Sequence, residues 1–127
     1  MFLLDTHTLI WFLDNDSRLP LGTKRQIESA EAVCVSIVSL WEIAIKINIG
    51  KLTLITNFQA IEQNLIEQDI SILPINITAI QAYLTLPLHH RDPFDRILIA
   101  QSIDLALTVV SCDRQFDAYP VTRLWDV

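Results

Sequence analysis

Four carboxylates at widely separated positions are the residues of this chain that are most able to do chemistry together: Asp5, Glu42, Asp95 and Asp113. Asp5 directly follows the apolar run 2–4, and Asp113 follows a second, valine-rich run, which is the pattern of buried strands in a parallel sheet. Ligands of open α/β sheets bind outside the carboxyl ends of the strands. We therefore expect Asp5 and Asp113 at one rim of a sheet, where a catalytic site would lie.

Each acid also has a purely structural explanation. Asp5 stands where a helix would begin, and Asp is a preferred helix N-cap. Glu42 lies three residues after Ser39 and four before Lys46, spacings that suit a capping box and a helical ion pair. Asp113 after a strand is a common turn residue. Taken singly, these structural interpretations are favoured, so a functional prediction depends on the acids lying together.

The segment Asp92-Pro93-Phe94-Asp95 has the composition of a helix start, with a cap, a proline at the first helical position and an acid at the third. Asp95 would thus lie in a first helical turn, as Glu42 does. Right-handed crossovers in a parallel sheet bring such helix starts to the same rim as the strand ends. Four independent caps would have no reason to converge there.

Carboxylates gathered without partners repel one another, and some would bind protons at neutral pH. A divalent cation removes this conflict, and an all-oxygen ligand set suits Mg²⁺ or Mn²⁺ better than zinc. The histidines lack the spacing of zinc ligands relative to either cysteine. We interpret His89 and His90 as loop residues, and His7 as a structural residue with a possible supporting role behind the ligands.

The elements that must position these acids alternate along the chain. Strands are expected at 1–4, 32–35, 70–74 and 108–112, with a shorter one at 121–124. Helices are expected at 8–13, 23–30, from Ser36 or Ser39 to about Ile49 with a stop at Gly50, and at 58–68, 78–84 and 93–105. Alternating strands and helices predict one α/β domain over residues 1–127, with helices on both faces of a central parallel sheet.

The 127 residues are 51% hydrophobic, with a mean hydropathy of +0.37. The longest uncharged segment, 70–90, contains two prolines and polar residues, so it is not a membrane span. The first residues lack a basic region and Asp5 interrupts their apolar run, which argues against a secretory signal. We expect a cytosolic protein whose apolar surplus serves a sheet buried on both faces and an oligomer contact.

The formal net charge of −6 excludes nucleic-acid binding by bulk electrostatics. Any such role needs a local basic patch or a bound cation. Four basic residues near the expected rim are candidate phosphate contacts, although surface solvation alone explains each slightly better: Lys46, Lys51, Arg96 and Arg114. Both cysteines, Cys34 and Cys112, lie in valine-rich runs and are expected to be buried, reduced thiols.

Five segments together resemble the PIN domain, and most closely the VapC-type toxins of bacterial toxin–antitoxin pairs. They are L-L-D-T-H-T-L-I-W at 3–11, S-x-x-S-x-W-E-I-A-I-K at 36–46, G-K-L at 50–52, H-H-R-D-P-F-D-R at 89–96 and S-x-D at 111–113. The resemblance implies a Mg²⁺- or Mn²⁺-dependent ribonuclease, a homodimer inhibited by a small cognate antitoxin protein. It also implies a three-layer α/β/α fold with strand order 3-2-1-4-5.

Position by position, the resemblance implies that the family's acidic quartet is Asp5, Glu42, Asp95 and Asp113. Asp5, Asp95 and Asp113 would be the metal ligands, and Glu42 a further ligand or the base that orients the attacking water. Candidate supporting groups behind the ligands are Asp92, for which a role as helix cap alone is the alternative, and the hydroxyls of Thr6 and Ser111. The implied strand order also separates the two cysteines by two strands, beyond the reach of a disulfide.

Two other enzyme classes fit less well, and one non-enzymatic interpretation stays open. Phosphatases with an aspartate nucleophile need a second Asp at position 7, where this chain has His7. A phosphoacceptor receiver domain needs an Asp after the third strand, where this chain has Asn76. The alternative is a non-catalytic PIN-like interaction module whose acids are only helix caps.

Overall fold

The computed structural model describes residues 1–126. Its centre is a parallel five-stranded sheet in the order β3-β2-β1-β4-β5. The strands are β1 (Phe2–Leu4), β2 (Val33–Ser36), β3 (Ile70–Leu73), β4 (Thr108–Val110) and β5 (Thr122–Leu124). The order expected from the family resemblance is therefore confirmed, with β1 and β4 side by side.

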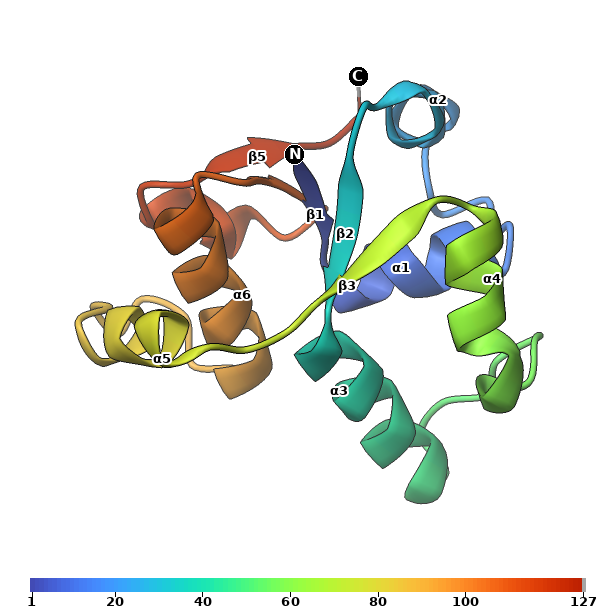
Figure 1. Ribbon diagram of the computed structural model, residues 1–127, viewed down its shortest axis with the longest axis horizontal. Coiled ribbons are helices and arrows are strands. Elements are labelled where there is room, and N and C mark those ends of the chain that lie inside the picture. The colour runs from blue at the N-terminus through green and yellow to red at the C-terminus, as the bar shows by residue number, and fades with distance from the viewer. Residues whose placement is uncertain (127) are drawn as a thin grey trace.

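Six α-helices and two short 3₁₀ turns connect the strands. The helices are α1 (Thr6–Leu13), α2 (Leu21–Ser29), α3 (Ile37–Asn48), α4 (Ile61–Glu67), α5 (Ile77–Leu84) and α6 (Pro93–Leu105), and the turns are η1 (Phe58–Ala60) and η2 (Arg114–Ala118). Figure 1 shows α5 and α6 on one side of the sheet and α1, α2 and α4 on the other, with α3 leading away from the end of β2. This is the three-layer arrangement expected from the sequence.

The sheet is buried on both faces because successive side chains of each strand point to opposite layers. Leu4 and Val110 pack with α1, α2 and α4 in one core. Their neighbours Leu3 and Val109 pack with α6 and η2 in the other. The uninterrupted apolar composition of these strands follows from that two-sided burial.

Several boundaries differ from those expected. Helix α1 begins at Thr6 rather than Thr8, because Asp5 caps it. Ser36, not Ser39, caps α3 by accepting a hydrogen bond from the backbone of Val38. The helical pattern at 58–68 divides into η1 and α4, with Asn57 capping the first.

The sheet is also shorter at β4 than expected, which corrects the interpretation of one cysteine. Strand β4 ends at Val110, so Cys112 lies beyond it and is exposed rather than buried. Cys34, in β2, is buried, and burial raises the pKa of its thiol to about 11. Both thiols are free, as the strand order implied.

Helix α3 ends where the sequence predicted. Gly50 adopts a φ of 75°, and its amide and that of Lys51 donate to the carbonyls of Ile47 and Lys46, which closes a Schellman motif. Among the helices of residues 1–126, none is long and apolar enough to cross a membrane.

Candidate metal centre

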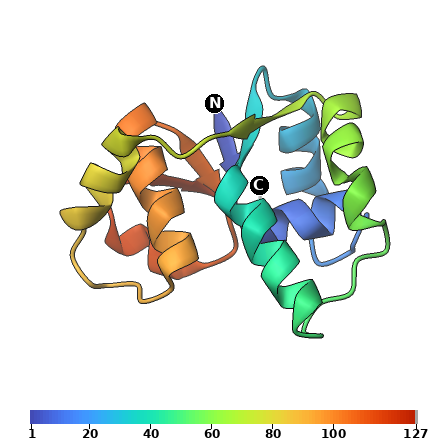
Figure 2. The ribbon, with the colours of Figure 1, turned by 60° about the horizontal axis from the view of Figure 1, so that its bottom comes forward.

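The candidate site lies at the rim where β1 and β4 end. Asp5 follows β1 and Asp113 lies three residues past β4, so the sheet itself brings them to one edge. In Figure 2, β1 points toward the place where α1 and α3 begin. The expected convergence of strand ends and helix starts is therefore present in the fold.

Asp95 and Asp113 meet at this rim around a residue that the sequence did not single out. The Nε2 atom of His90 lies 3.0 Å from Oδ2 of Asp95 and 3.1 Å from Oδ2 of Asp113. One potential ligand atom from each of the three residues lies within 4.8 Å of the others. Asp95 lies in the first turn of α6 and Asp113 caps η2, whereas His90 comes from the loop before α6.

Asp5 is almost completely buried, with 3% of its surface exposed. Its Oδ1 accepts a hydrogen bond from the backbone of Thr8 at 2.9 Å, and its Oδ2 accepts one from the hydroxyl of Ser111. Ser111 also accepts from the backbone of Asp113 at 3.0 Å, which links the two acids through one hydroxyl. Because a carboxylate has about four lone-pair sites, the capping role of Asp5 leaves capacity for a cation.

Glu42 is buried and held by two neighbours, Thr6 and Lys46. Its Oε1 accepts from the hydroxyl of Thr6 at 2.6 Å, and its Oε2 lies 2.8 Å from the ammonium of Lys46. Thr6 Oγ1 lies 3.0 Å from Ser39 Oγ; since Thr6 gives its one proton to Glu42, Ser39 donates to Thr6. The predicted ion pair with Lys46 is confirmed, whereas Ser39 supports Glu42 through Thr6 instead of capping α3.

The negative charges of the other acids act together on Asp95. Burial, followed by the negative charges of Asp92, Asp5, Glu42 and Asp113, raises its pKa to about 8. Burial also raises the pKa of Asp5, against the hydrogen bonds from Ser111 and Thr8. The other three acids of the sequence prediction, with Asp92, therefore all raise the pKa of Asp95.

This donor set fits a hard divalent cation. Carboxylate oxygens are the ligands that Mg²⁺ and Mn²⁺ prefer, and a positive ion would relieve the repulsion that raises the pKa of Asp95. Asp95 and Asp113 have side-chain oxygens facing the same point. Asp5 lies outside this three-residue cluster and is linked to it through Ser111, whose hydroxyl donates to Asp5 and accepts from the backbone of Asp113. Asp92 has a different role: its Oδ1 accepts from the backbones of Phe94 and Asp95 and caps α6.

Basic residues near the rim differ from expectation in one case. Arg96 is buried, and its guanidinium donates to the carbonyls of Leu86, Pro87 and His90 and contacts the Tyr119 hydroxyl. It is therefore a structural residue of the loop before α6, and the expectation of a phosphate contact is wrong. Lys46 is paired with Glu42, whereas Lys51 and Arg114 are exposed.

Sequence reasoning missed His90, which is only 6% exposed. It lies in a loop outside any hydrophobic repeat, so periodicity gave no sign of its burial. The available signal was its place two residues before the capping Asp92, since a cap fixes the chain entering the helix. His89 and His7, by contrast, are exposed, and His7 stacks on Trp11 at 5.9 Å between ring centroids.

A family model of the PIN domain matches residues 2–121. The chain belongs to the PIN domain family. This assignment covers the whole sheet except the last strand and includes every acid of the candidate site. The assignment agrees with the absence of the aspartates that the phosphatase and receiver-domain classes need, at positions where this chain has His7 and Asn76. No curated protein matches the sequence.

Solved structures of the same fold include VapBC and FitAB complexes. A chain in DNA-bound VapBC from Salmonella typhimurium superposes on this PIN domain with a TM-score of 0.73 and 18% identity, over 97% of this chain and 96% of that one. A chain in promoter-bound VapBC2 from Rickettsia felis gives 0.71 and 13%, over 98% of both chains. A chain in FitAcB from Neisseria gonorrhoeae gives 0.67 and 19%, over 98% and 96%. At these identities the similarity supports the fold alone.

Proposed function

We propose that this PIN domain is a Mg²⁺- or Mn²⁺-dependent endoribonuclease that hydrolyses RNA phosphodiester bonds. The observation that carries the proposal is the position of Asp95 among four other carboxylates, where burial and then their charges raise its pKa to about 8. A fold that needed these acids only as caps would gain nothing from concentrating their charge. A cation site explains the concentration, because metal binding offsets the repulsion.

Asp95 and Asp113, with Asp5, would hold the ion. When bound, a divalent ion supplies a Lewis acid and lowers the pKa of a coordinated water so that it can attack phosphorus. Asp5 is fixed by Thr8 and Ser111, so it offers its remaining lone pairs in a preset direction. Glu42 is immobilised by Thr6 and Lys46, which suits a group that orients water better than one that moves.

The acidic net charge limits how RNA is bound. The cation would neutralise part of the site's charge, and exposed Lys51 and Arg114 are the remaining candidates for phosphate contacts. Lys46 would contribute only by sharing its ammonium between Glu42 and a phosphate. A ribonuclease needs access to RNA, so a cytoplasmic location is part of this proposal.

We further propose that the enzyme is the toxin of a toxin–antitoxin pair and forms a homodimer. The solved structures of the same fold are VapBC and FitAB complexes. Large apolar side chains are also exposed on this chain, including Trp41, Ile77 and Leu84. Such surface is unusual on a free monomer and supports a protein partner.

The rival function is a non-catalytic interaction module, and one observation favours it. Asp5, Asp92 and Asp113 all cap helical segments, as that interpretation requires. Metal-dependent cleavage of RNA separates the two functions, because a set of caps needs no cation.

The test is cleavage of a structured RNA with Mn²⁺, with Mg²⁺ and with a chelator. Asp5→Asn keeps the cap oxygen but removes the charge, so we expect cleavage to fall by about 10²-fold or more, a loss typical of a key electrostatic group. Asp69→Asn is the matched control, since Asp69 is exposed at the far end of the sheet, at the start of β3. Wild-type cleavage by Asp5→Asn, or cleavage that survives the chelator, would refute the proposal.

A further inference from the structure

The contacts of His90 decide which of its ring nitrogens carries a proton. The backbone N–H of Asp92 donates to Nδ1 at 3.2 Å. A ring nitrogen that accepts a hydrogen bond carries no proton, so the proton of the neutral imidazole is on Nε2. Nε2 is also the atom that lies between Asp95 and Asp113.

This arrangement is the reverse of the one found in metal-binding histidines. A ligating imidazole coordinates through a bare nitrogen and donates a proton from the other to a carboxylate or carbonyl. Here the nitrogen that faces the carboxylates has the proton, and it donates to Oδ2 of Asp113 at 3.1 Å. Oδ2 of Asp95 lies 3.0 Å from the same nitrogen. His90 therefore faces the site as a donor, although its distances alone would suit a ligand.

The imidazole has little freedom to turn round. The hydroxyl of Tyr119 accepts from the backbone of His90 at 2.8 Å and donates to the carbonyl of Pro87 at 2.7 Å. Arg96 donates to the carbonyl of His90 at 3.2 Å, and the ring of Phe116 packs edge-on against the imidazole. These buried groups hold both the loop and the ring, and so preserve the direction of the Nε2 proton.

We propose that His90 is a positioning residue of the metal centre and not one of its ligands. Its Nε2 proton draws the side chains of Asp95 and Asp113 to one point before a cation arrives. The inference rests on the proposed metal-dependent function and assigns the ligands to the carboxylates alone. It also gives Arg96 and Tyr119 a reason to be buried beneath the loop.

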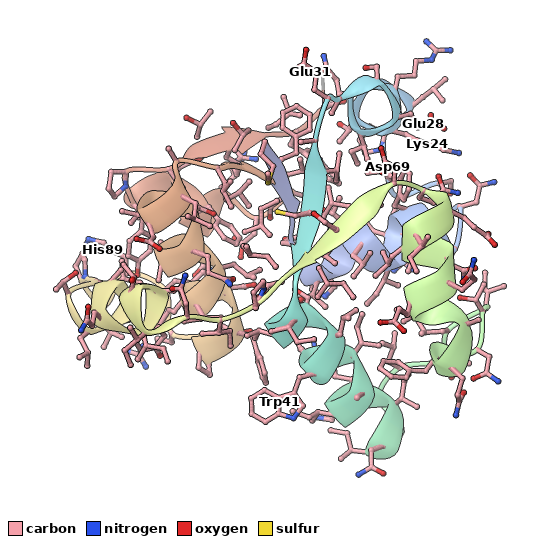
Figure 3. All side chains as sticks on the ribbon, in the orientation of Figure 1. Lys24, Glu28, Glu31, Trp41, Asp69 and His89 are labelled. Carbon is pink, nitrogen blue, oxygen red and sulfur yellow. The ribbon has the colours of Figure 1, made fainter. Side chains whose placement is uncertain are left out.

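Three variants separate this role from ligation and from simple packing. His90→Gln places an amide N–H near the position of Nε2, whereas His90→Asn keeps a polar group near Nδ1 but does not reach the carboxylates. His89→Asn is the matched control, because His89 is adjacent in sequence but exposed, at the outer edge of the molecule in Figure 3. Thermal unfolding of each metal-free variant establishes that it is folded.

The first measurement is Mn²⁺ affinity by calorimetry. We expect His90→Asn to weaken binding by about 10- to 100-fold, the usual cost of losing a group that orients ligands. His90→Gln should restore most of the affinity, and His89→Asn should bind as the unaltered protein does. Equal affinity in all four proteins would overturn the inference and leave the proposed metal site standing. Absence of Mn²⁺ binding to the unaltered protein would overturn both.

Two spectroscopic measurements on the unaltered protein test the assignment without relying on variants. Nitrogen-15 NMR of the metal-free protein should show the His90 proton on Nε2. Pulsed electron paramagnetic resonance of the Mn²⁺ complex should show no coupling from a directly bound imidazole nitrogen. A proton on Nδ1 would show that Nε2 is not a donor, and a coupling that is present in the unaltered protein and lost in His90→Gln would show that His90 is a ligand. Either result would refute the proposal.

Discussion

Among single residues, Asp95 shows most clearly how the site is built. Its carboxyl group is partly buried and faces the charges of Asp92, Asp5, Glu42 and Asp113, so its pKa rises from 3.8 to about 8. Asp95 therefore keeps a proton at neutral pH when no cation is bound to offset the charges of the neighbouring acids. A divalent ion and a proton therefore compete for the same group.

The first prediction concerns the pH dependence of the metal-free protein. Between pH 4 and pH 8 the folded state binds a proton at Asp95 that the unfolded state has released, so stability falls as pH rises through this window. Asp95→Asn removes that dependence. We expect the metal-free variant to be more stable than the unaltered protein by about 2 kcal/mol at pH 8, and by less at pH 5. Urea unfolding at the two pH values measures the difference.

Asp69→Asn is again the control, and it should follow the unaltered protein at both pH values. A stability gap between Asp95→Asn and the unaltered protein that stayed constant, or that grew as pH fell, would show that the carboxyl of Asp95 is not strained by its neighbours.

For single residues, the sequence predicted the positions of the acids well, but it did not predict the burial of other polar residues. The quartet of acids could be predicted because strand ends and helix starts have local signatures. His90 and Arg96 could not, since their burial depends on a loop folding over Tyr119, which no local pattern encodes. The same loop buries Arg96, which the sequence had suggested would lie at the surface.

Among the elements, the starts of helical segments both build and position the site. Asp5, Asp92 and Asp113 cap α1, α6 and η2, which fixes the direction of each carboxylate with its own backbone. The two interpretations that the sequence left open for these acids are therefore compatible. A capping carboxylate uses one lone pair to accept a hydrogen bond from the helix backbone, and its other lone pairs remain available.

Asp92 provides the second prediction, because its observed contacts are those of a cap. Asp92→Asn keeps an oxygen for the amides of Phe94 and Asp95, so the cap and the Mn²⁺ affinity should change little, while loss of its charge should lower the pKa of Asp95. Asp92→Ala removes the cap and should cost about 1 kcal/mol in urea unfolding. If Asp92→Asn lost Mn²⁺ binding as Asp95→Asn does, Asp92 would have to be a ligand.

Element types were predictable from the sequence, and their ends less so. Helix α6 has the bounds that the sequence predicted, because a cap, a proline and an acid mark its start. Strand β4 is shorter than its apolar run, because its two neighbours, β1 and β5, each pair with it over only three residues. The order of the strands came from the family resemblance, because local patterns do not specify which strands pair.

At the scale of the whole molecule, exposed apolar surface predicts self-association. Trp41 is 63% exposed on α3, packs edge-on against Phe94 of α6, and projects outward in Figure 3. We expect Trp41→Glu to shift the protein from dimer to monomer, because it places a charge in an apolar contact. Sedimentation velocity measures the change, and Ile55→Glu, at an exposed loop position, is the control. A monomeric unaltered protein would contradict the proposed homodimer.

The most direct test of the central claim is the thermal unfolding midpoint at pH 8 with and without Mn²⁺. Binding to the folded state alone stabilises it by about 2.7 kcal/mol when Mn²⁺ is at 100 times its Kd. We expect this to raise the midpoint by roughly 10 °C in the unaltered protein, and by much less in Asp95→Asn. An equal response in the two proteins, or no response in either, would contradict the assignment of the carboxylate cluster as a metal centre.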